Sequence, residues 1–280
     1  MNLRWAAILA LALTPAALFA AEGTFDKTLS VNGAATVNVN TGSGYIHITP
    51  GSDGSVHIIG HVHSSHGWLG GSPEEAVRKI TDNPPINQSG NIIDIGQHTH
   101  FENVSIDYVI TAPRGTTVDA GSGSGDIDVS NLGAPLKAGT GSGDIEVNDL
   151  TGDVALSTGS GDIRAMMNQA HYVKAETGSG SIHLTGVSGG LYAETGSGDI
   201  EVGGQPGDGW KLETGSGSVT LNTGSSAHFS LDASTGSGEV HSDPPLTTHG
   251  SFERHHVMGD INGGGPTVRV ETGSGDIRIH

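Results

Sequence analysis

The 280-residue sequence has no cysteine and few lysine, arginine or aromatic residues. Without cysteine the chain cannot form disulfides, zinc–thiolate or iron–sulfur sites, or the lipid-bearing cysteine of a lipoprotein. Its 12 basic residues stand against 30 acidic ones, and the net charge of −18 argues against nucleic acid or an anionic membrane surface as partner. Only 34% of the residues are hydrophobic, which is little for a large catalytic domain but enough for a narrow, regularly stacked core.

The first 20 residues differ in character from the rest of the chain. A short basic start is followed by an apolar run from Trp5 to Leu13 and by a stretch rich in small residues from Ala16 to Ala21. This order is typical of a secretory signal peptide, which we assign to residues 1–20. We therefore expect an exported chain, located in the periplasm, at the cell surface or secreted. No later run is long and apolar enough to cross a bilayer, so we expect no membrane span.

Glycine is abundant, with 46 residues, and much of it lies in a repeated Gly-Ser-Gly tripeptide. The first glycine of each copy falls at positions 42, 123, 141, 159, 178, 196, 215, 236 and 273. From position 123 the first five intervals are 18 or 19 residues, whereas the last is 37 and equals two periods. We expect the segment Met258–Ile261 to hold a degenerate copy that fills this gap.

Apolar residues alternate with polar ones on both sides of each Gly-Ser-Gly. Around the copy at position 141, Leu136 and Ala138 precede the glycines, and Ile145 and Val147 follow them. A period of two indicates two short strands, each with one face inward, joined at a glycine corner. Coils stacked in register would pair equivalent strands in parallel sheets about 4.8 Å apart. The sequence thus predicts an all-β parallel β-helix (β-solenoid) of two or three sheets, with coils of 18–19 residues built on T-G-S-G-[DS]-[IV] repeats.

Two parts of this solenoid are expected, with irregular coils over residues 21–115 and regular repeats over residues 116–280. Within the first part, Ser72 is an N-cap residue, Pro73 suits the first helical position and Pro84 ends the pattern. These signals predict one short helix over about 73–81 that caps the end of the hydrophobic column.

The last strand of the sequence, Asp276 to His280, is predicted to form an uncovered final coil. An uncovered coil exposes unpaired backbone groups, so we expect end-to-end self-association.

The order of these motifs resembles the bacterial putative-adhesin domain. The resemblance covers about Phe25 to His280 and includes V-x-I-x-Y-x-I-x-A-P-R-G-T, the repeated T-G-S-G-D-I, and the closing G-G-G-P-x-V-R-V-E-T-G-S-G-D-I-R-I. It implies a β-strand-repeat fold of a family of unknown function found in exported and envelope proteins. The family supplies no catalytic residues.

An acidic residue follows Gly-Ser-Gly in most copies. A column of carboxylates about 4.8 Å apart would either hold calcium between coils or cap backbone N–H groups at the glycine turn. We favour capping, because Ser181 and Ser218 interrupt the column. The candidate calcium ladder consists of Asp126, Asp144, Asp162, Asp199 and Asp276.

Histidine is frequent, at 15 residues, and His57, His61, His63 and His66 lie close together in the sequence. His61 and His63 share one face of a predicted strand and could chelate a zinc, nickel or copper ion. The alternative is a set of exposed strand residues that become cationic below about pH 6.5. No other cofactor is indicated.

The outward face of the first strand in each coil carries two predicted ladders of charge. One contains Lys137, Lys174, Lys211 and Arg269, and the adjacent one contains Glu176, Glu194, Glu213 and Glu271. We interpret them as solvated sheet faces, with a flat polar ligand surface around Tyr192 as the alternative.

The motifs of serine hydrolases, P-loop proteins and dinucleotide-binding enzymes are missing from the sequence. We expect a non-catalytic binding or structural module of the bacterial cell envelope. Its partner would be a cell-surface or cell-wall component, or another envelope protein. The alternatives are a carbohydrate-active β-helix enzyme on acidic polysaccharide and a metal or envelope-stress sensing module.

Overall fold

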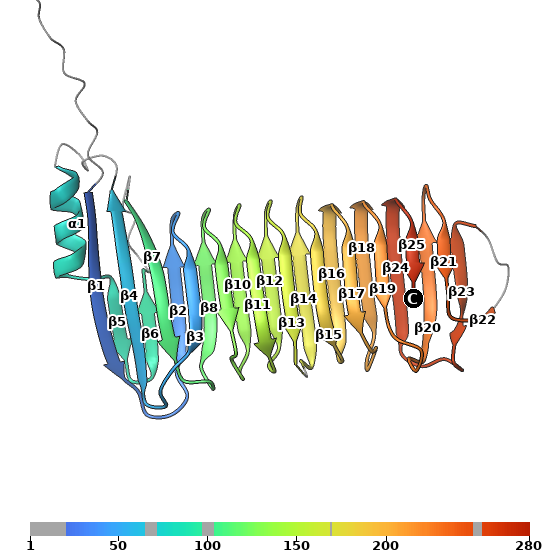
Figure 1. Cartoon of the computed structure of the whole chain (residues 1–280), viewed down its shortest axis with the longest axis horizontal. Helices are drawn as coiled ribbons and strands as arrows, with labels where there is room; N and C mark the ends of the chain where they lie inside the picture. The colour runs from blue at the N-terminus through green and yellow to red at the C-terminus, as the bar shows by residue number, and fades with distance from the viewer. Residues whose placement is uncertain (1–20, 65–71, 97–103, 169, 249–253) are drawn as a thin grey trace, which may run out of the picture.

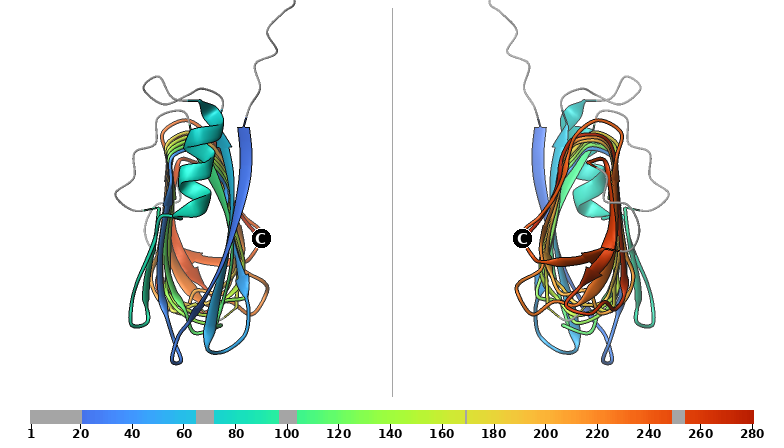
Figure 2. Two further views of the ribbon diagram at one scale, coloured as in Figure 1. Left: turned by 90° about the vertical axis from the view of Figure 1, so that its left-hand side faces the viewer. Right: turned by 90° about the vertical axis from the view of Figure 1, so that its right-hand side faces the viewer.

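Each sequence repeat forms one coil of two strands, which confirms the predicted parallel β-solenoid. The computed structural model describes residues 21–64, 72–96, 104–168, 170–248 and 254–280 (Figure 1). The coils follow one another along the long axis, and viewed along that axis they superpose as a flattened ring (Figure 2). The long sides of this ring are two sheets, and the described residues form no third one. The predicted signal peptide, residues 1–20, lies outside the described residues.

Sheet A has 12 strands and contains the strand that follows each glycine corner. In spatial order they are β1 (Ala21–Ser30), β4 (Ser55–Ser64), β7 (Val104–Ala112), β3 (Ile46–Pro50), β9 (Ile127–Ser130), β11 (Ile145–Leu150), β13 (Ile163–Met167), β15 (Ile182–Val187), β17 (Ile200–Gly204), β19 (Val219–Asn222), β25 (Ile277–Ile279) and β21 (Val240–Ser242). From β7 to β21 every neighbour is parallel, whereas β4 runs antiparallel to both β1 and β7.

Sheet B has 13 strands and contains the strand that precedes each corner. In spatial order they are β22 (Leu246–Thr248), β23 (His256–Ile261), β20 (Phe229–Thr235), β24 (Thr267–Ser274), β18 (Trp210–Ser216), β16 (Gly190–Ser197), β14 (Tyr172–Thr177), β12 (Val154–Thr158), β10 (Leu136–Thr140), β8 (Thr117–Ser122), β2 (Thr36–Thr41), β6 (Ile92–Ile95) and β5 (Ile86–Ser89). The strands from β6 to β20 are parallel, and β5, β23 and β22 are antiparallel additions.

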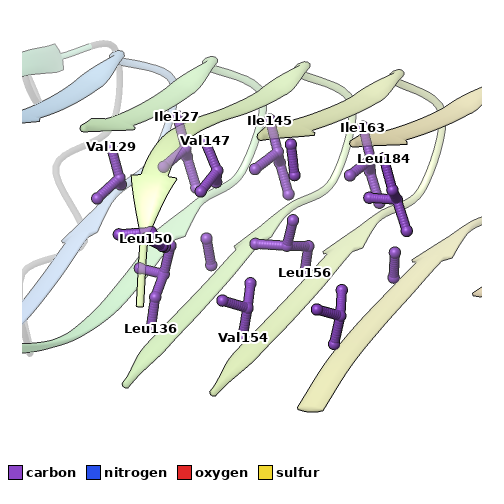
Figure 3. Packing of buried hydrophobic residues seen from close by; sticks show 14 of the residues in the cluster. Ile127, Val129, Leu136, Ile145, Val147, Leu150, Val154, Leu156, Ile163 and Leu184 are labelled. Atoms are coloured by element: carbon purple, nitrogen blue, oxygen red, sulfur yellow. The ribbon is translucent and has the colours of Figure 1, made fainter. Parts of the chain in front are cut away.

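The core is a column of apolar side chains between the two sheets. Ile127, Ile145 and Ile163 stand in register on adjacent strands of sheet A, each at most 1% exposed. Val154 and Leu156 enter the same space from sheet B (Figure 3). Burial of each such side chain is worth about 2 kcal/mol, so the alternation of the sequence is the main source of stability.

The corner glycines touch the preceding coil. A Cβ built on Gly161 would lie only 1.9 Å from the carbonyl oxygen of Gly143, and one built on Gly159 would lie 2.4 Å from that of Gly141. No other residue fits between coils at this spacing, so the repeat needs glycine for close backbone approach.

A buried threonine precedes seven of the nine Gly-Ser-Gly corners and links neighbouring coils. The hydroxyl of Thr158 donates to the carbonyl oxygen of Gly143 at 2.8 Å and accepts from the N–H of Gly161 at 3.2 Å. The same donation recurs at Thr140, Thr177, Thr195, Thr214, Thr235 and Thr272. These hydroxyls satisfy backbone groups that the corner would otherwise leave unpaired.

We expect the substitution Thr158→Val to destabilise the protein by about 1 to 3 kcal/mol, because it keeps the shape but leaves two buried backbone groups without a partner. Chemical denaturation would measure this loss. The matched control is Ser157→Ala, one residue earlier on the exposed face. Equal stability of the two variants would contradict a role for the hydroxyl ladder.

The helix α1 (Pro73–Asp82) closes the N-terminal end of the column, as predicted. Ser72 caps it by accepting from the N–H of Glu75 at 3.2 Å, and its buried residues Val77 and Ile80 face the core. Seen from that end, α1 lies across the opening between the sheets (Figure 2). Within the described ranges, no helix has the length and apolar character needed to cross a membrane.

The C-terminal end differs from the sequence prediction. The last coil of the chain, β24 with β25, lies between the coil of β18 and β19 and the coil of β20 and β21. The prediction that Asp276–His280 is an uncovered end coil is therefore wrong, and with it the stated basis for end-to-end association. Met258–Ile261 is not a degenerate coil either, because it belongs to β23, which runs antiparallel to β20 and, with β22, closes sheet B.

The N-terminal end has the same arrangement. The first coil of the chain, β2 with β3, lies between β6 with β7 on one side and β8 with β9 on the other. At both ends of the solenoid, the two-strand coil that is first or last in the sequence is therefore not the outermost one, because another coil stacks on its outer side.

Candidate functional site

The outer face of sheet B carries two adjacent rows of polar side chains across four neighbouring coils. The strand register places Lys174, Tyr192, Lys211 and Arg269 in the first row and Glu176, Glu194, Glu213 and Glu271 in the second. We call them the cation row and the glutamate row. The predicted ladders are thus aligned in space, although Ala155 separates Lys137 from Lys174 and Lys137 pairs with Asp119 instead.

Each cation pairs with the glutamate two residues later on its own strand. The ammonium of Lys174 lies 2.8 Å from Glu176, and that of Lys211 lies 2.8 Å from Glu213. The Nε of Arg269 donates to Oε1 of Glu271 at 2.8 Å. The hydrogen bonds that Lys174 and Arg269 donate to Glu176 and Glu271 raise the pKa of both cations. Both groups therefore stay cationic through the physiological pH range.

Tyr192 takes the place of a cation at the second position of the cation row, between Lys174 and Lys211. Its hydroxyl donates to Oε2 of Glu194 at 2.5 Å, and this hydrogen bond is the main reason that the pKa of Tyr192 is raised. Its ring lies between Lys174 and Lys211, whose ammonium groups are 5.8 and 5.4 Å from the ring centroid. Cation–π attraction to both neighbours holds the row together at this position.

The glutamate row borders a groove of about 660 Å³ along β16, β18, β24 and β20. Its lining consists of Glu194, Thr195, Gly196, Glu213, Thr214, Gly215, Ser234, Glu271, Thr272 and Gly273. Each glutamate uses one carboxylate oxygen for the partner on its own strand. Among the described residues, the second oxygen of each has no hydrogen-bond partner. The groove can therefore accept hydrogen bonds at the coil spacing of about 4.8 Å.

The aspartates of the candidate calcium ladder lie at the other edge of the glycine corner, beside sheet A. Oδ1 of Asp126 accepts from the N–H of Asp144 at 2.9 Å, and Oδ1 of Asp144 accepts from the N–H of Asp162 at 2.8 Å. Asp162, Asp199 and Asp276 accept in the same way from Ser181, Ser218 and Glu239. The serines separate Asp162 from Asp199 and Asp199 from Asp276. Each aspartate thus caps a backbone N–H group of the next coil.

We expect Asp199→Ala to lower the melting temperature by roughly 1 to 4 °C, because the N–H of Ser218 loses its acceptor. Asp199→Asn keeps an acceptor oxygen and should change it less. The calcium hypothesis is tested alongside by comparing CaCl₂ with NaCl at equal ionic strength. A calcium-specific rise that both variants lose would favour a metal ladder over backbone capping.

The predicted histidine site lies on the outward face of β4. His57 contacts Asp26 at 2.8 Å, His61 contacts the hydroxyl of Thr24 at 3.3 Å, and His63 lies 3.2 Å from Asp107. His66 lies outside the described residues, so the four-histidine site stays a prediction. In the part of the chain that the structure describes, no three His, Cys, Asp or Glu side chains are arranged to hold a metal ion.

Sequence reasoning did not identify the groove itself. Ser234 joins its lining only because β20 lies beside β24, although the two strands are far apart in the sequence. The threonine of each T-G-S-G copy was visible in the sequence, but its hydrogen bond to a neighbouring coil depends on the stacking of coils.

These features define a two-sheet parallel β-solenoid with closed ends and a repeating polar outer face. Residues 52–280 match the family model described as Toastrack DUF4097, and the chain belongs to this family. The resemblance to the putative-adhesin type of β-repeat protein is thereby confirmed.

Solved structures show similarity over most of the chain. A putative adhesin from Bacteroides fragilis NCTC 9343 aligns over 92% of this chain and 97% of that one, at 15% identity and a TM-score of 0.51. A putative adhesin from Parabacteroides distasonis ATCC 8503 covers the same shares at 12% identity and a TM-score of 0.41, which supports no further argument. At such identities the likeness extends to the fold alone. No curated protein matches the chain.

Proposed function

We propose that the protein is an exported, non-catalytic binding module of the bacterial cell envelope that holds its partner on the outer face of sheet B. One observation carries this proposal: the cation row and the glutamate row repeat over four coils beside a groove. A repeated face offers many equivalent weak contacts, and a partner that engages several of them at once binds more tightly through avidity. The partner would be a cell-surface or cell-wall component, or another envelope protein.

The environment of the glutamates favours binding over catalysis. Polysaccharide hydrolysis with two carboxyl groups needs one group that is protonated and one that is ionised, which requires different surroundings. Glu213 and Glu271 stand in register on adjacent strands, and each pairs with a cation two residues earlier on its own strand. Both carboxyl groups thus lie in similar surroundings, whereas the acid and the base of such a hydrolase lie in different ones.

The test is binding of purified residues 21–280 to intact cells and isolated cell-wall sacculi. We expect saturable binding that falls in the double variant Lys211→Ala, Arg269→Ala. The matched control removes two cations from the outer face of sheet A, Arg164→Ala with Arg278→Ala, each of which also pairs with an aspartate two residues away in the sequence. An equal effect of both double variants, or no binding at all, would refute the proposed face. Fractionation of cells that express the full chain tests export.

A further inference from the structure

The groove is rich in hydrogen-bond acceptors and poor in donors. The three threonine hydroxyls in its lining already donate to Gly180, Gly198 and Gly217. Glu194, Glu213 and Glu271 each keep one carboxylate oxygen without a partner among the described residues. Ser234 supplies the remaining side-chain hydroxyl of the lining. A ligand that fits must therefore bring the hydrogen-bond donors.

The charges beside the groove select against strongly charged ligands. The charges of Glu213 and Glu271 are balanced by ion pairs with Lys211 and Arg269, so a polycation would have to compete with these two side chains for the carboxylates. A polyanion would meet the row of carboxylate oxygens and the net charge of −18. Donors without charge meet neither obstacle, and hydroxyl groups are such donors.

The spacing of the coils selects against an extended peptide. Successive carboxylates along the groove stand one coil apart, about 4.8 Å, whereas same-side groups of an extended peptide repeat about every 6.6 to 6.8 Å. After two coil steps the peptide is already out of register by roughly 4 Å. A chain of sugar rings presents several hydroxyls on each ring, so donors fall opposite each successive glutamate.

From these three properties we infer that the groove binds a neutral, hydroxyl-rich polysaccharide whose chain runs along the solenoid axis. This inference rests on the proposed binding function and specifies its ligand class. Hydroxyls donate to the unpartnered oxygens of Glu194, Glu213 and Glu271, while the cation row holds each carboxylate in place. Several rings bound by several coils give affinity that grows with the length of the chain.

The experiment uses residues 21–280 and immobilised soluble polysaccharides in biolayer interferometry. The neutral probes are dextran, galactomannan and hydroxyethylcellulose, the polyanion is alginate and the polycation is polylysine. We expect saturable binding to a neutral probe that persists in 1 M salt, which screens charge attraction over distances beyond about 3 Å. The triple variant Glu194→Gln, Glu213→Gln, Glu271→Gln should weaken it at least tenfold. The control is Glu146→Gln with Glu201→Gln on the outer face of sheet A, and thermal melts verify that all variants are folded.

The outcomes separate the inference from the proposed function. Binding to alginate or polylysine alone, or unchanged binding of the triple variant to neutral chains, overturns the ligand class. Binding to sacculi that depends on Lys211 and Arg269, without binding to any neutral probe, also overturns it but leaves the proposed function standing. If no envelope material and no polysaccharide binds, both fail.

Discussion

Substitution of Gly161 by alanine is expected to destabilise the protein by about 3 kcal/mol or more, at the upper end of what single substitutions do. The new Cβ would lie 1.9 Å from the carbonyl oxygen and 2.5 Å from the carbonyl carbon of Gly143, both of which are backbone atoms of the preceding coil. The coils cannot move apart without breaking the ladder of both sheets at that point. Thermal and chemical denaturation of Gly161→Ala against the parent chain would measure the loss.

A matched control exists within the same motif. Gly42 is the first glycine of the earliest Gly-Ser-Gly copy, and a Cβ built there has no heavy atom within 4 Å. Neither Gly42 nor Gly161 has a positive φ, so the comparison isolates the steric contact from backbone strain. Gly42→Ala should be close to neutral. If both variants lose the same stability, close approach between coils is not what the glycine provides.

Removal of residues 267–280 should unfold more of the protein than those 14 residues. The deleted segment forms β24 and β25, which pair with β18 and β19 on one side and with β20 and β21 on the other. In a solenoid each coil is stabilised mainly by its nearest neighbours. A variant that ends at Pro266 therefore leaves β20, β21 and β23 without a coil to stack on.

Hydrogen exchange would locate the loss. We expect fast exchange in β20, β21, β22 and β23 of the shortened variant, while β8 to β17 keep their protection. A variant that lacks only His280 is the control, since it keeps both strands and loses the contact of His280 with Asp243. Retained protection of β20 in the shortened variant would mean that the outer coil folds without the inserted one.

The sequence predicts the coil but not the order of coils at the ends. Alternation around T-G-S-G specifies two strands and their inward faces, because burial of one face is the dominant driving force. It does not specify neighbours: Val219, Val240 and Ile277 occupy the same slot and are similar in size, so any of them could pair with another. The structure places Ile277 between the other two.

The candidate site was predictable from the sequence only where the repeat period alone determines which residues of neighbouring strands pair. The cation row and the glutamate row could be read from the 18- and 19-residue spacing, since equal slots must align. Which carboxylate oxygens are left without a partner depends on side-chain geometry within each strand. The spacing of the repeats in the sequence carries no information on that geometry. The antiparallel β4 and β23 were also unpredictable, because alternation carries no information on strand direction.

The inward placement of both terminal coils has a consequence for how the family can change over evolution. Gene duplication that adds or removes one 18- or 19-residue unit between β8 and β19 leaves both interlocked ends intact, because every internal coil presents the same two stacking surfaces. Loss of β2 with β3, or of β24 with β25, would instead separate the two coils on either side of the lost one, because those two coils are joined only through it. Descendants of this gene should therefore differ in the number of central units while both ends keep their length.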